Sequence, residues 1–448
     1  MSALLAQREI VNPSPAKEGA LRVLLVPDSI HWVLGTIAKS IASANPIDAT
    51  IVSGPLLGDI FADADTIAGR FDVVHFLCPY ASREWLPRLQ DKLPVVTSHH
   101  HVTSWDLISH NVHGDAIVAG SSEWVRDLES RGADMSRVFR VPYGVDTDLF
   151  APPSAGQRQA SRAALGLNAT GPVIGFFAKR ASNDDDRKGT DVFVDAMMRL
   201  NEKKVAPAAL IVGPGWKEMV GRFREHGIQT AWIPFADDTA QLPRLYHALD
   251  FYWVTSRVEG GPVPLLEAMS TEVCCLSTAV GLAQELVADG ENALLLPMDD
   301  ASAFADATFD LWSDRARMRA MGRSARETMV AAMRGSDVAK LVQPAYNRAI
   351  AFFSSRNPDA AAKKRATARP ALDGDELRKI NMLEDLAWAE NLVLYQGEHV
   401  AALKLIMRAW AGSPFSLMPL RVFLRRFLPE PVTRGVVAVK HKLPGGAG

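Results

Sequence analysis

The feature that most constrains this 448-residue chain is an alternation of short strand-like and longer helix-like segments that occurs twice. In the first half, short β-branched or apolar runs begin at Leu21, Asp48, Phe71, Leu93, Asp115 and Val138. In the second half, similar runs begin at Val173, Ala208, Thr230, Asp250, Val273 and Asn292. This alternation is typical of a parallel sheet covered by helices on both faces. One hydrophobic core rarely grows beyond about 250–300 residues, so two series indicate two domains.

The expected domain boundaries follow from breaks in this pattern. The string APPSAGQRQA at 151–160 is rich in turn residues and separates the two series, so we take it as an interdomain linker. The prediction is an α/β protein: a Rossmann-like, doubly wound domain at 20–150 and a second at 160–355. Ligands of such domains bind beyond the carboxyl ends of the strands, which places the expected site in a cleft between the two domains.

The remaining C-terminal part has a different composition. Residues 356–374 are rich in Ala, Lys and Pro and are interpreted as a mobile linker. Residues 375–448 are expected to form a basic helical appendage of three helices between 375 and 428. Residues 401–448 hold eight Lys or Arg and one acid, so this stretch carries +7 and leaves −9 on residues 1–400. The acidic remainder argues against a nucleic-acid partner.

Two readings of the appendage stay open. It either packs as a helical cap on the second domain, or it contacts anionic lipid through Arg421, Arg425 and Arg426. Within it, Val400, Leu403, Leu405 and Ile406 are assigned to one apolar helical face, and Leu420, Phe423, Leu424 and Phe427 to another.

The composition also bears on the compartment. The chain is 48% hydrophobic and 22% charged, and no apolar run approaches the roughly 18 residues that span a bilayer. The N-terminal stretch lacks the pattern of a secretory signal. Cys78, Cys274 and Cys275 fit neither a zinc site nor a disulfide framework. We therefore expect a cytoplasmic protein, which under the second reading of the appendage also has a peripheral contact at the inner face of the membrane.

The strongest chemical signal is VTSRVEGGPVPLLEAMS at 254–270. A strand ends, a turn with Gly260, Gly261 and Pro262 follows, and an apolar helix begins. Glycine amides and a helix N-terminus can approach a diphosphate closely. Glu259 and Glu267, with seven residues between them, can accept hydrogen bonds from sugar or ribose hydroxyls.

This string resembles the paired-glutamate signature of the family 4 retaining glycosyltransferases, which have the GT-B fold. The resemblance covers about residues 20–350. It implies that Glu259 binds the transferred sugar, Glu267 binds the ribose, and the anomeric configuration is retained.

A second segment, IGFFAKRASNDDDRKGTDVFVDAM at 174–197, resembles the strand, basic loop and Lys-Gly helix start of the same family. Lys188 is implied to face the donor diphosphate, together with either Lys179 or Arg180. Fixed cations there would stabilise the charge that grows on the leaving oxygen. The run Asp184, Asp185 and Asp186 could be read as a metal-binding motif, but we interpret it as a solvated loop. We therefore expect no metal and no cofactor.

Two features of the first domain are candidates for the acceptor side. In VVTSHHHVTSW at 95–105, His99 matches the family's histidine at a strand end, although His100 or His101 could be the equivalent. The loop after the first strand lacks the paired glycines of the family and holds Trp32, which either stacks on a sugar or packs in the core. The string VPYGVDTDLF at 141–150 has Tyr143 where the family has Asn.

The resulting prediction is a metal-independent hexosyltransferase that moves a sugar from a nucleotide-diphosphate sugar to a glycan, lipid-linked glycan or other hydroxyl acceptor. The catalytic residues would be His99, Lys188 and Glu259. Two alternatives are a sugar-nucleotide epimerase or hydrolase of the same fold, and a catalytically silent sugar-binding protein. A role in polysaccharide biosynthesis is the expected context.

Overall fold

The computed structural model describes residues 20–100, 109–168, 170–180, 186–234, 242–366, 372–396, 399–412 and 416–427. Its first sheet has six parallel strands in the order β2-β1-β3-β4-β5-β6. The strands are β1 (Leu21–Val26), β2 (Ile47–Ile51), β3 (Val73–Phe76), β4 (Val95–His99), β5 (Ala116–Ala119) and β6 (Val138–Arg140). The helices between them are α1 (Val33–Ala44), η1 (Gly54–Leu56), α2 (Leu57–Ile60), α3 (Ala64–Arg70), α4 (Pro79–Leu89), η2 (Ser109–His113), α6 (Ser122–Ser130) and η3 (Met135–Arg137).

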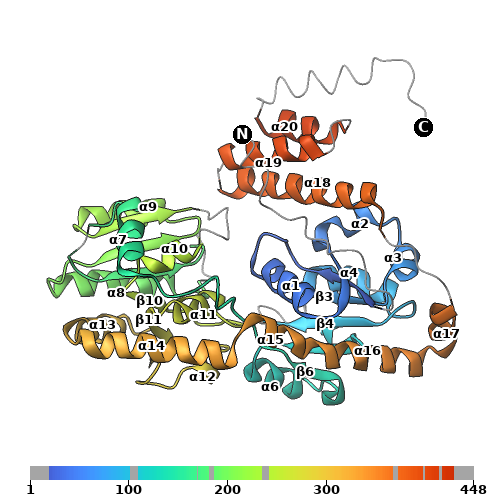
Figure 1. Ribbon diagram of the computed structural model, residues 1–448, viewed down its shortest axis with the longest axis horizontal. Helices are drawn as coiled ribbons and strands as arrows, with labels where there is room; N and C mark the ends of the chain where they lie inside the picture. Colours follow the sequence, from blue (N-terminus) through green and yellow to red (C-terminus); the bar gives the residue numbers. More distant parts are fainter. Residues whose placement is uncertain are drawn as a thin grey trace.

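The second sheet also has six parallel strands, in the order β12-β11-β10-β7-β8-β9. These are β7 (Val173–Phe177), β8 (Ala208–Val212), β9 (Gln229–Ile233), β10 (Phe251–Val254), β11 (Cys274–Thr278) and β12 (Leu294–Leu296). Their helices are α7 (Ala155–Ala164), α8 (Thr190–Glu202), α9 (Lys217–Glu225), α10 (Leu242–His247), α11 (Val263–Ser270), α12 (Ala283–Leu286), α13 (Ala301–Ser313) and α14 (Arg315–Ala332). The predicted fold of two doubly wound domains is thus confirmed, and they stand next to each other in Figure 1.

The chain returns to the first domain before residue 355. This return is made by α15 (Gly335–Ala339), η4 (Lys340–Val342) and α16 (Gln343–Arg356). Val342, Ala345 and Tyr346 lie in the same buried cluster as Val23 and Leu25 of β1. The predicted second domain of 160–355 is therefore too long, because its last helices complete the first domain.

The appendage also belongs to the first domain. It comprises α17 (Pro358–Ala366), α18 (Gly374–Asn391), the π-helical turn η5 (Leu392–Gln396), α19 (His399–Gly412) and α20 (Met418–Phe427). Leu383 and Leu386 of α18 and Ile406 of α19 share one buried cluster with Leu24 and Trp85. In Figure 1, α18 to α20 lie over the first domain. The expectation of a cap on the second domain is therefore wrong.

Two predicted linkers are partly helical. Of the string at 151–160, residues from Ala155 onward form α7, because Ser154 and Gln157 make a reciprocal capping box at its start. Residues 358–366 of the predicted 356–374 linker form α17. Proline and glycine marked these places correctly as breaks, but the Ala-rich residues beside them favour helix. Across the described parts of the chain, every helix is too short or too polar to cross a bilayer.

Candidate active site

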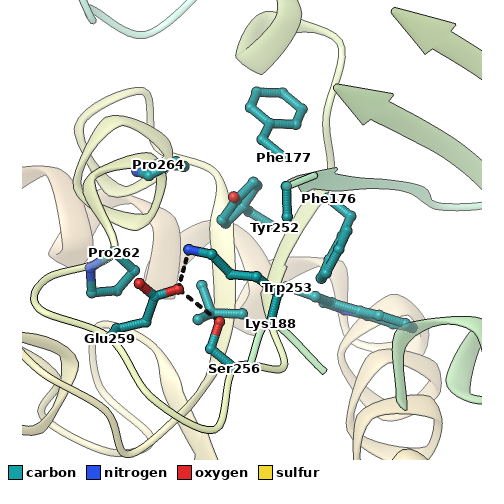
Figure 2. A pocket seen from close by; sticks show the side chains of 11 residues that line it. Phe176, Phe177, Lys188, Tyr252, Trp253, Ser256, Glu259, Pro262 and Pro264 are labelled. Atoms are coloured by element: carbon teal, nitrogen blue, oxygen red, sulfur yellow. Dashed lines mark hydrogen bonds and ion pairs between the residues drawn. The ribbon is translucent and has the colours of Figure 1, made fainter. Parts of the chain in front are cut away.

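The site forms in the second domain where two neighbouring strands, β7 and β10, end beside the start of α11. A pocket there is walled by aromatic side chains of these strands, including Phe177 and Tyr252. Its polar part consists of Lys188, Ser256 and Glu259, whose side chains converge in Figure 2. The pocket thus lies at the carboxyl ends of parallel strands, where such folds bind ligands.

An ion pair is the chemical centre of this pocket. Lys188 Nζ lies 2.5 Å from Glu259 Oε1, and Ser256 Oγ donates to the same oxygen at 2.8 Å. The Glu259 side chain is buried, whereas that of Lys188 is 30% exposed. Burial by itself would raise the pKa of Glu259, but the nearby Lys188 ammonium and the two hydrogen bonds outweigh it, so the pKa is lowered. Glu259 is therefore ionised at neutral pH and can accept hydrogen bonds.

The backbone around Lys188 explains the Lys-Gly pair. Gly189 has φ +62°, and a Cβ at this position would stand 2.0 Å from the carbonyl oxygen of Thr255. Thr255 Oγ1 in turn donates to the carbonyls of Lys188 and Gly189. Only glycine fits this left-handed position against β10. The close approach fixes the start of α8, and with it Lys188, beside the end of β10.

The start of α11 adds a second source of positive potential. Pro262 is its N-cap residue, and no side chain caps the first amides. Pro262 and Pro264 both line the pocket, so the N-terminal end of α11 opens toward Lys188. The partial positive charge of a helix N-terminus and an ammonium together suit an anionic group such as a diphosphate.

Glu267 lies further along α11 and does not line this pocket. The hydroxyl of Tyr246 donates to Glu267 Oε2 at 2.5 Å. Burial raises the pKa of Glu267 to about 7, against the opposing effect of that hydrogen bond. Burial also raises the pKa of Tyr252, and the charges of Glu267 and Glu259 raise it further, so both carboxylates act on one tyrosine hydroxyl. The two predicted glutamates therefore share one neighbourhood but have different protonation behaviour.

The two glycines of the turn approach protein atoms of the first domain. A Cβ on Gly260 would lie 2.1 Å from the carbonyl oxygen of His100, and one on Gly261 would lie 2.4 Å from the ring of Tyr143. The expectation that they leave room for a diphosphate is not tested by this packing. What the structure adds is a second reason for glycine here, namely close contact between the domains.

The histidines at the end of β4 point in different directions. His99 is buried, and its Nε2 lies 3.1 Å from Asp127 of α6. Burial lowers the pKa of His99 despite this carboxylate. His100 instead shares a hydrogen bond with Tyr143, whose hydroxyl lies 2.6 Å from His100 Nδ1 beside the glycine turn. His99 therefore faces α6, and His100 faces the second domain; His101 lies outside the described residues.

The basic loop after β7 holds the other predicted cations. Lys179 is exposed and Arg180 is half-buried, and the backbone amide of Arg180 donates to the carbonyl of Pro214 at 3.0 Å. Ala178 lines the pocket, so this loop borders it. Neither side chain makes an ion pair with the described part of the chain. The choice between Lys179 and Arg180 thus stays open.

Trp32 lies at the start of α1 in the first domain and is 45% exposed. Its ring meets Trp388 of α18 edge-on, with centroids 5.9 Å apart, and His31 stacks on the same tryptophan at 5.0 Å. Trp32 is thus neither buried in the core nor free of contacts. The loop after β1 therefore packs, through His31 and Trp32, against α18 of the appendage.

Of the acidic run at 184–186, the structure describes Asp186. Asp184 and Asp185 lie outside the described residues. Asp186 Oδ2 accepts from Thr190 Oγ1 at 2.7 Å and from the amide of Asp191 at 3.1 Å, so it caps the start of α8. In the described ranges, no group of three or more His, Cys, Asp or Glu is arranged to hold a metal ion.

Three residues of the site were missed from the sequence. Ser256 is recognisable only once its hydroxyl is seen on Glu259. Trp124 of α6 donates from its indole nitrogen to the carbonyl of Glu259 at 3.0 Å, across the domain boundary. Tyr143 fills a slot between Gly120 and Gly261. A signal existed for Tyr143 alone, as the departure from Asn in the 141–150 string.

Comparison with solved structures defines the class of fold. Solved structures with the same two-domain architecture include Anabaena Alr3699/HepE in complex with UDP, with TM-score 0.58, 16% identity, and coverage of 72% of this chain and 98% of that one. A second is the sucrose-phosphate synthase from Thermosynechococcus elongatus, with TM-score 0.58, 17% identity, and coverage of 74% and 99%. These neighbours establish the GT-B fold.

The sequence comparisons find similarity to glycosyltransferases over part of the chain. Residues 171–314 match the family model described as glycosyl transferases group 1. The lipopolysaccharide core biosynthesis mannosyltransferase LpsB of Rhizobium meliloti is 32% identical over 40% of this chain and 52% of its own length. A D-inositol 3-phosphate glycosyltransferase of Nocardia farcinica is 26% identical over 58% and 63%. The chain thus spans about half to two thirds of the length of these curated relatives. Its fold is the predicted GT-B fold, and its residues 171–314 are similar to the group 1 glycosyltransferases.

Proposed function

We propose that this protein transfers a sugar from a nucleotide-diphosphate sugar to a hydroxyl acceptor. The observation that carries the proposal is the Lys188–Glu259 pair at the start of α11, inside the segment that matches the group 1 family. An ionised carboxylate suits sugar hydroxyls, and an ammonium beside a helix N-terminus suits a diphosphate. UDP in the HepE complex and the mannosyl and inositol phosphate glycosyltransferases among the relatives support a donor of this kind.

The proposed chemistry is departure of the nucleoside diphosphate with acceptor attack on the same face of the sugar, which retains the anomeric configuration. Lys188, aided by Arg180 or Lys179, would stabilise the charge that develops on the leaving phosphate oxygen. These side chains and the end of α11 would supply the positive charge without a metal ion. A diphosphate at Lys188 would compete with Glu259 for the ammonium and so release the carboxylate to the sugar.

In the first domain, we propose that His100 lies nearest the transferred sugar. The sequence had favoured its neighbour His99 for this role. The support is geometric, because His100 adjoins Gly260 and Tyr143, whereas His99 is engaged by Asp127. Glu267 would hold the ribose. The acceptor is proposed to be a glycan or a lipid-linked glycan, at the cytoplasmic face of a membrane and in polysaccharide assembly.

The test is product analysis with a panel of sugar nucleotides that are first ranked by thermal shift, since a bound donor raises the apparent stability. Donor consumption that requires an added glycan acceptor, with an unchanged anomeric configuration by NMR, is expected. Epimerised or hydrolysed donor as the sole product would favour the epimerase or hydrolase alternative. Donor binding without any turnover would favour a silent sugar-binding protein.

A further inference from the structure

The outer face of α19 carries an apolar stripe that the fold leaves in solvent. Val400, Leu403, Met407 and Trp410 recur at helical spacing and are 70%, 39%, 57% and 38% exposed. Just beyond, Leu417 and Met418 at the start of α20 are 62% and 42% exposed. We call these six residues the α19 stripe. Contiguous exposed apolar side chains on one face mark an interaction surface.

The stripe is separate from the face that holds α19 on the molecule. Ala402, Ile406 and Ala409 are buried and belong to the first domain's core cluster, with Leu405 packed against it. The sequence had assigned Val400, Leu403, Leu405 and Ile406 to one face. The structure divides them, with Leu405 and Ile406 inward and Val400 and Leu403 outward. The stripe residues are therefore not part of this core cluster.

The charges around the α19 stripe indicate which kind of partner covers it. Residues 399–427 contain Lys404, Arg408, Arg421, Arg425 and Arg426 but no Asp or Glu. Lys404 and Arg421 are exposed, and Arg408 pairs with Asp385 of α18 at 2.7 Å. An apolar stripe flanked by exposed cations such as Lys404 and Arg421 is the pattern of a helix that lies in the headgroup region of an anionic bilayer.

The same charge argues against a second copy of the chain. In a twofold dimer, the stripe of one copy would face that of the other. Lys404 and Arg421 of both copies would then meet with no acid on either helix, which costs free energy. An anionic lipid surface removes this conflict.

We infer that α19 and the start of α20 dock this protein on anionic phospholipid, with the α19 stripe inserted among the acyl chains and Lys404 and Arg421 at the headgroups. This deepens the proposed function by naming the lipid contact and its residues, and it rests on that proposal only for the nature of the acceptor. In Figure 1, α19 and α20 lie on the outer side of α18, away from the domain beneath it.

The test is flotation of the full-length protein with vesicles of phosphatidylcholine alone or mixed equally with phosphatidylglycerol. Point substitutions are preferable to deletion of the appendage, because deletion would uncover the core cluster that Leu386 and Ile406 complete. Val400→Glu with Met407→Glu places acids at two strongly exposed positions of the stripe while keeping a helix former. Met298→Glu with Val330→Glu makes the same change at exposed positions of the second domain.

The wild type is expected to float with the anionic vesicles and less in high salt, which screens the cations. The stripe variant should partition at least about tenfold less, while the second-domain variant should match the wild type. Failure of the wild type to float, or equal flotation of the stripe variant, would overturn the inference. So would a wild-type dimer in light scattering that the stripe variant abolishes, because a second copy would then cover the stripe.

Donor binding by thermal shift, measured on the same proteins, separates this inference from the proposed function. The stripe variant should bind the sugar nucleotide like the wild type, since α19 is remote from Lys188 and Glu259. Flotation without donor binding would sustain the docking surface and count against the glycosyltransferase proposal. Donor binding without flotation would overturn the docking surface and leave the glycosyltransferase proposal supported.

Discussion

At the scale of single residues, the site depends on how one ammonium and one carboxylate share a pocket. Lys188 keeps Glu259 ionised, although the carboxylate is buried. An uncompensated charge on Glu259 at that depth would be costly, so the Lys188 ammonium also stabilises the carboxylate in the folded pocket. The pair therefore preserves the pocket and suits the anionic donor that we propose.

Lys188→Ala should lower turnover by about 10²-fold or more, because it removes a fixed cation from the leaving phosphate. Lys203→Ala is the matched control, since Lys203 also pairs with an acid, Asp306, but on the surface of the same domain. Initial rates of sugar transfer at saturating donor provide the measurement. A wild-type rate for Lys188→Ala would remove Lys188 from the diphosphate site.

At the scale of elements, the glycine turn before α11 is where the two domains touch. Gly261→Ala would place a methyl group 2.4 Å from the Tyr143 ring and 2.8 Å from Leu282. We expect a loss of about 1–3 kcal/mol in the free energy of unfolding, as for other overpacked sites. Adding Tyr143→Asn should recover part of it, because the ring is removed.

Gly69→Ala serves as the control for this change. Gly69 lies in α3, and a methyl group added there would have open space around it, with no atom of the described chain within 4 Å. This substitution should leave the stability unchanged or raise it by about 0.5–1 kcal/mol. Chemical denaturation of the variants gives the comparison, and equal stabilities of Gly261→Ala and wild type would contradict the expected clash.

The attachment of α18 to the first domain predicts a pH dependence. Both oxygens of the buried Glu384 accept hydrogen bonds from Ser53, from its amide and its hydroxyl, each at 2.6 Å. Burial, followed by Asp385, raises the pKa of Glu384 to about 7 from an ordinary 4.5, while Ser53 and Lys39 oppose the shift. The folded protein thus holds this proton more tightly than the unfolded chain. Its contribution is complete below pH 4.5 and is lost as the pH rises through 7.

Glu384→Gln should therefore flatten the fall in stability between about pH 5 and 8, by up to about 3 kcal/mol. The amide resembles the protonated acid and can keep contacts with Ser53. Urea unfolding at a series of pH values is the measurement. Glu267→Gln offers a comparison, because the pKa of Glu267 is also raised to about 7 by burial but in the second domain. Parallel pH curves for Glu384→Gln and wild type would count against the assignment.

At the scale of the whole molecule, α6 of the first domain meets α12 of the second. Glu285 accepts from the amide of Ser122 and pairs with Arg140, while Glu123 accepts from the amide of Gly281 at 2.9 Å. Trp124 of the same helix α6 adds the hydrogen bond to the carbonyl of Glu259. Interfaces of this polar kind permit relative domain motion.

Glu285→Ala should loosen the domains and increase the radius of gyration in small-angle X-ray scattering. Glu291→Ala, at an exposed position of the same domain, should leave it unchanged. A bound nucleotide should reduce the difference if it bridges both domains. An identical scattering profile for Glu285→Ala and wild type would show that this contact does not hold the domains together.

The sequence predicted the local structure well because each strand is a short apolar run, as at Leu21–Val26 and Phe251–Val254. Contacts between segments far apart in the chain were harder to predict from the sequence. The Tyr346 hydroxyl meets His75 Nδ1 at 3.1 Å across 271 positions, and no periodicity reveals that contact. Likewise, the apolar face of α18 shows that it packs, but not on which domain. Strand alternation implies that His99 and His100 diverge, yet only the structure shows which one meets α6.

The route of the chain has a consequence for its synthesis. The first domain is assembled from residues 20–150 together with elements from Gly335 to α20, with the whole second domain encoded between them. On a ribosome, the second domain has all its residues available while the first still lacks Tyr346, Leu386 and Ile406. We therefore expect the customary order, in which the N-terminal domain folds first, to be reversed here. Apolar side chains such as Leu24 and Trp85 therefore lack their final partners until α18 and α19 have been translated.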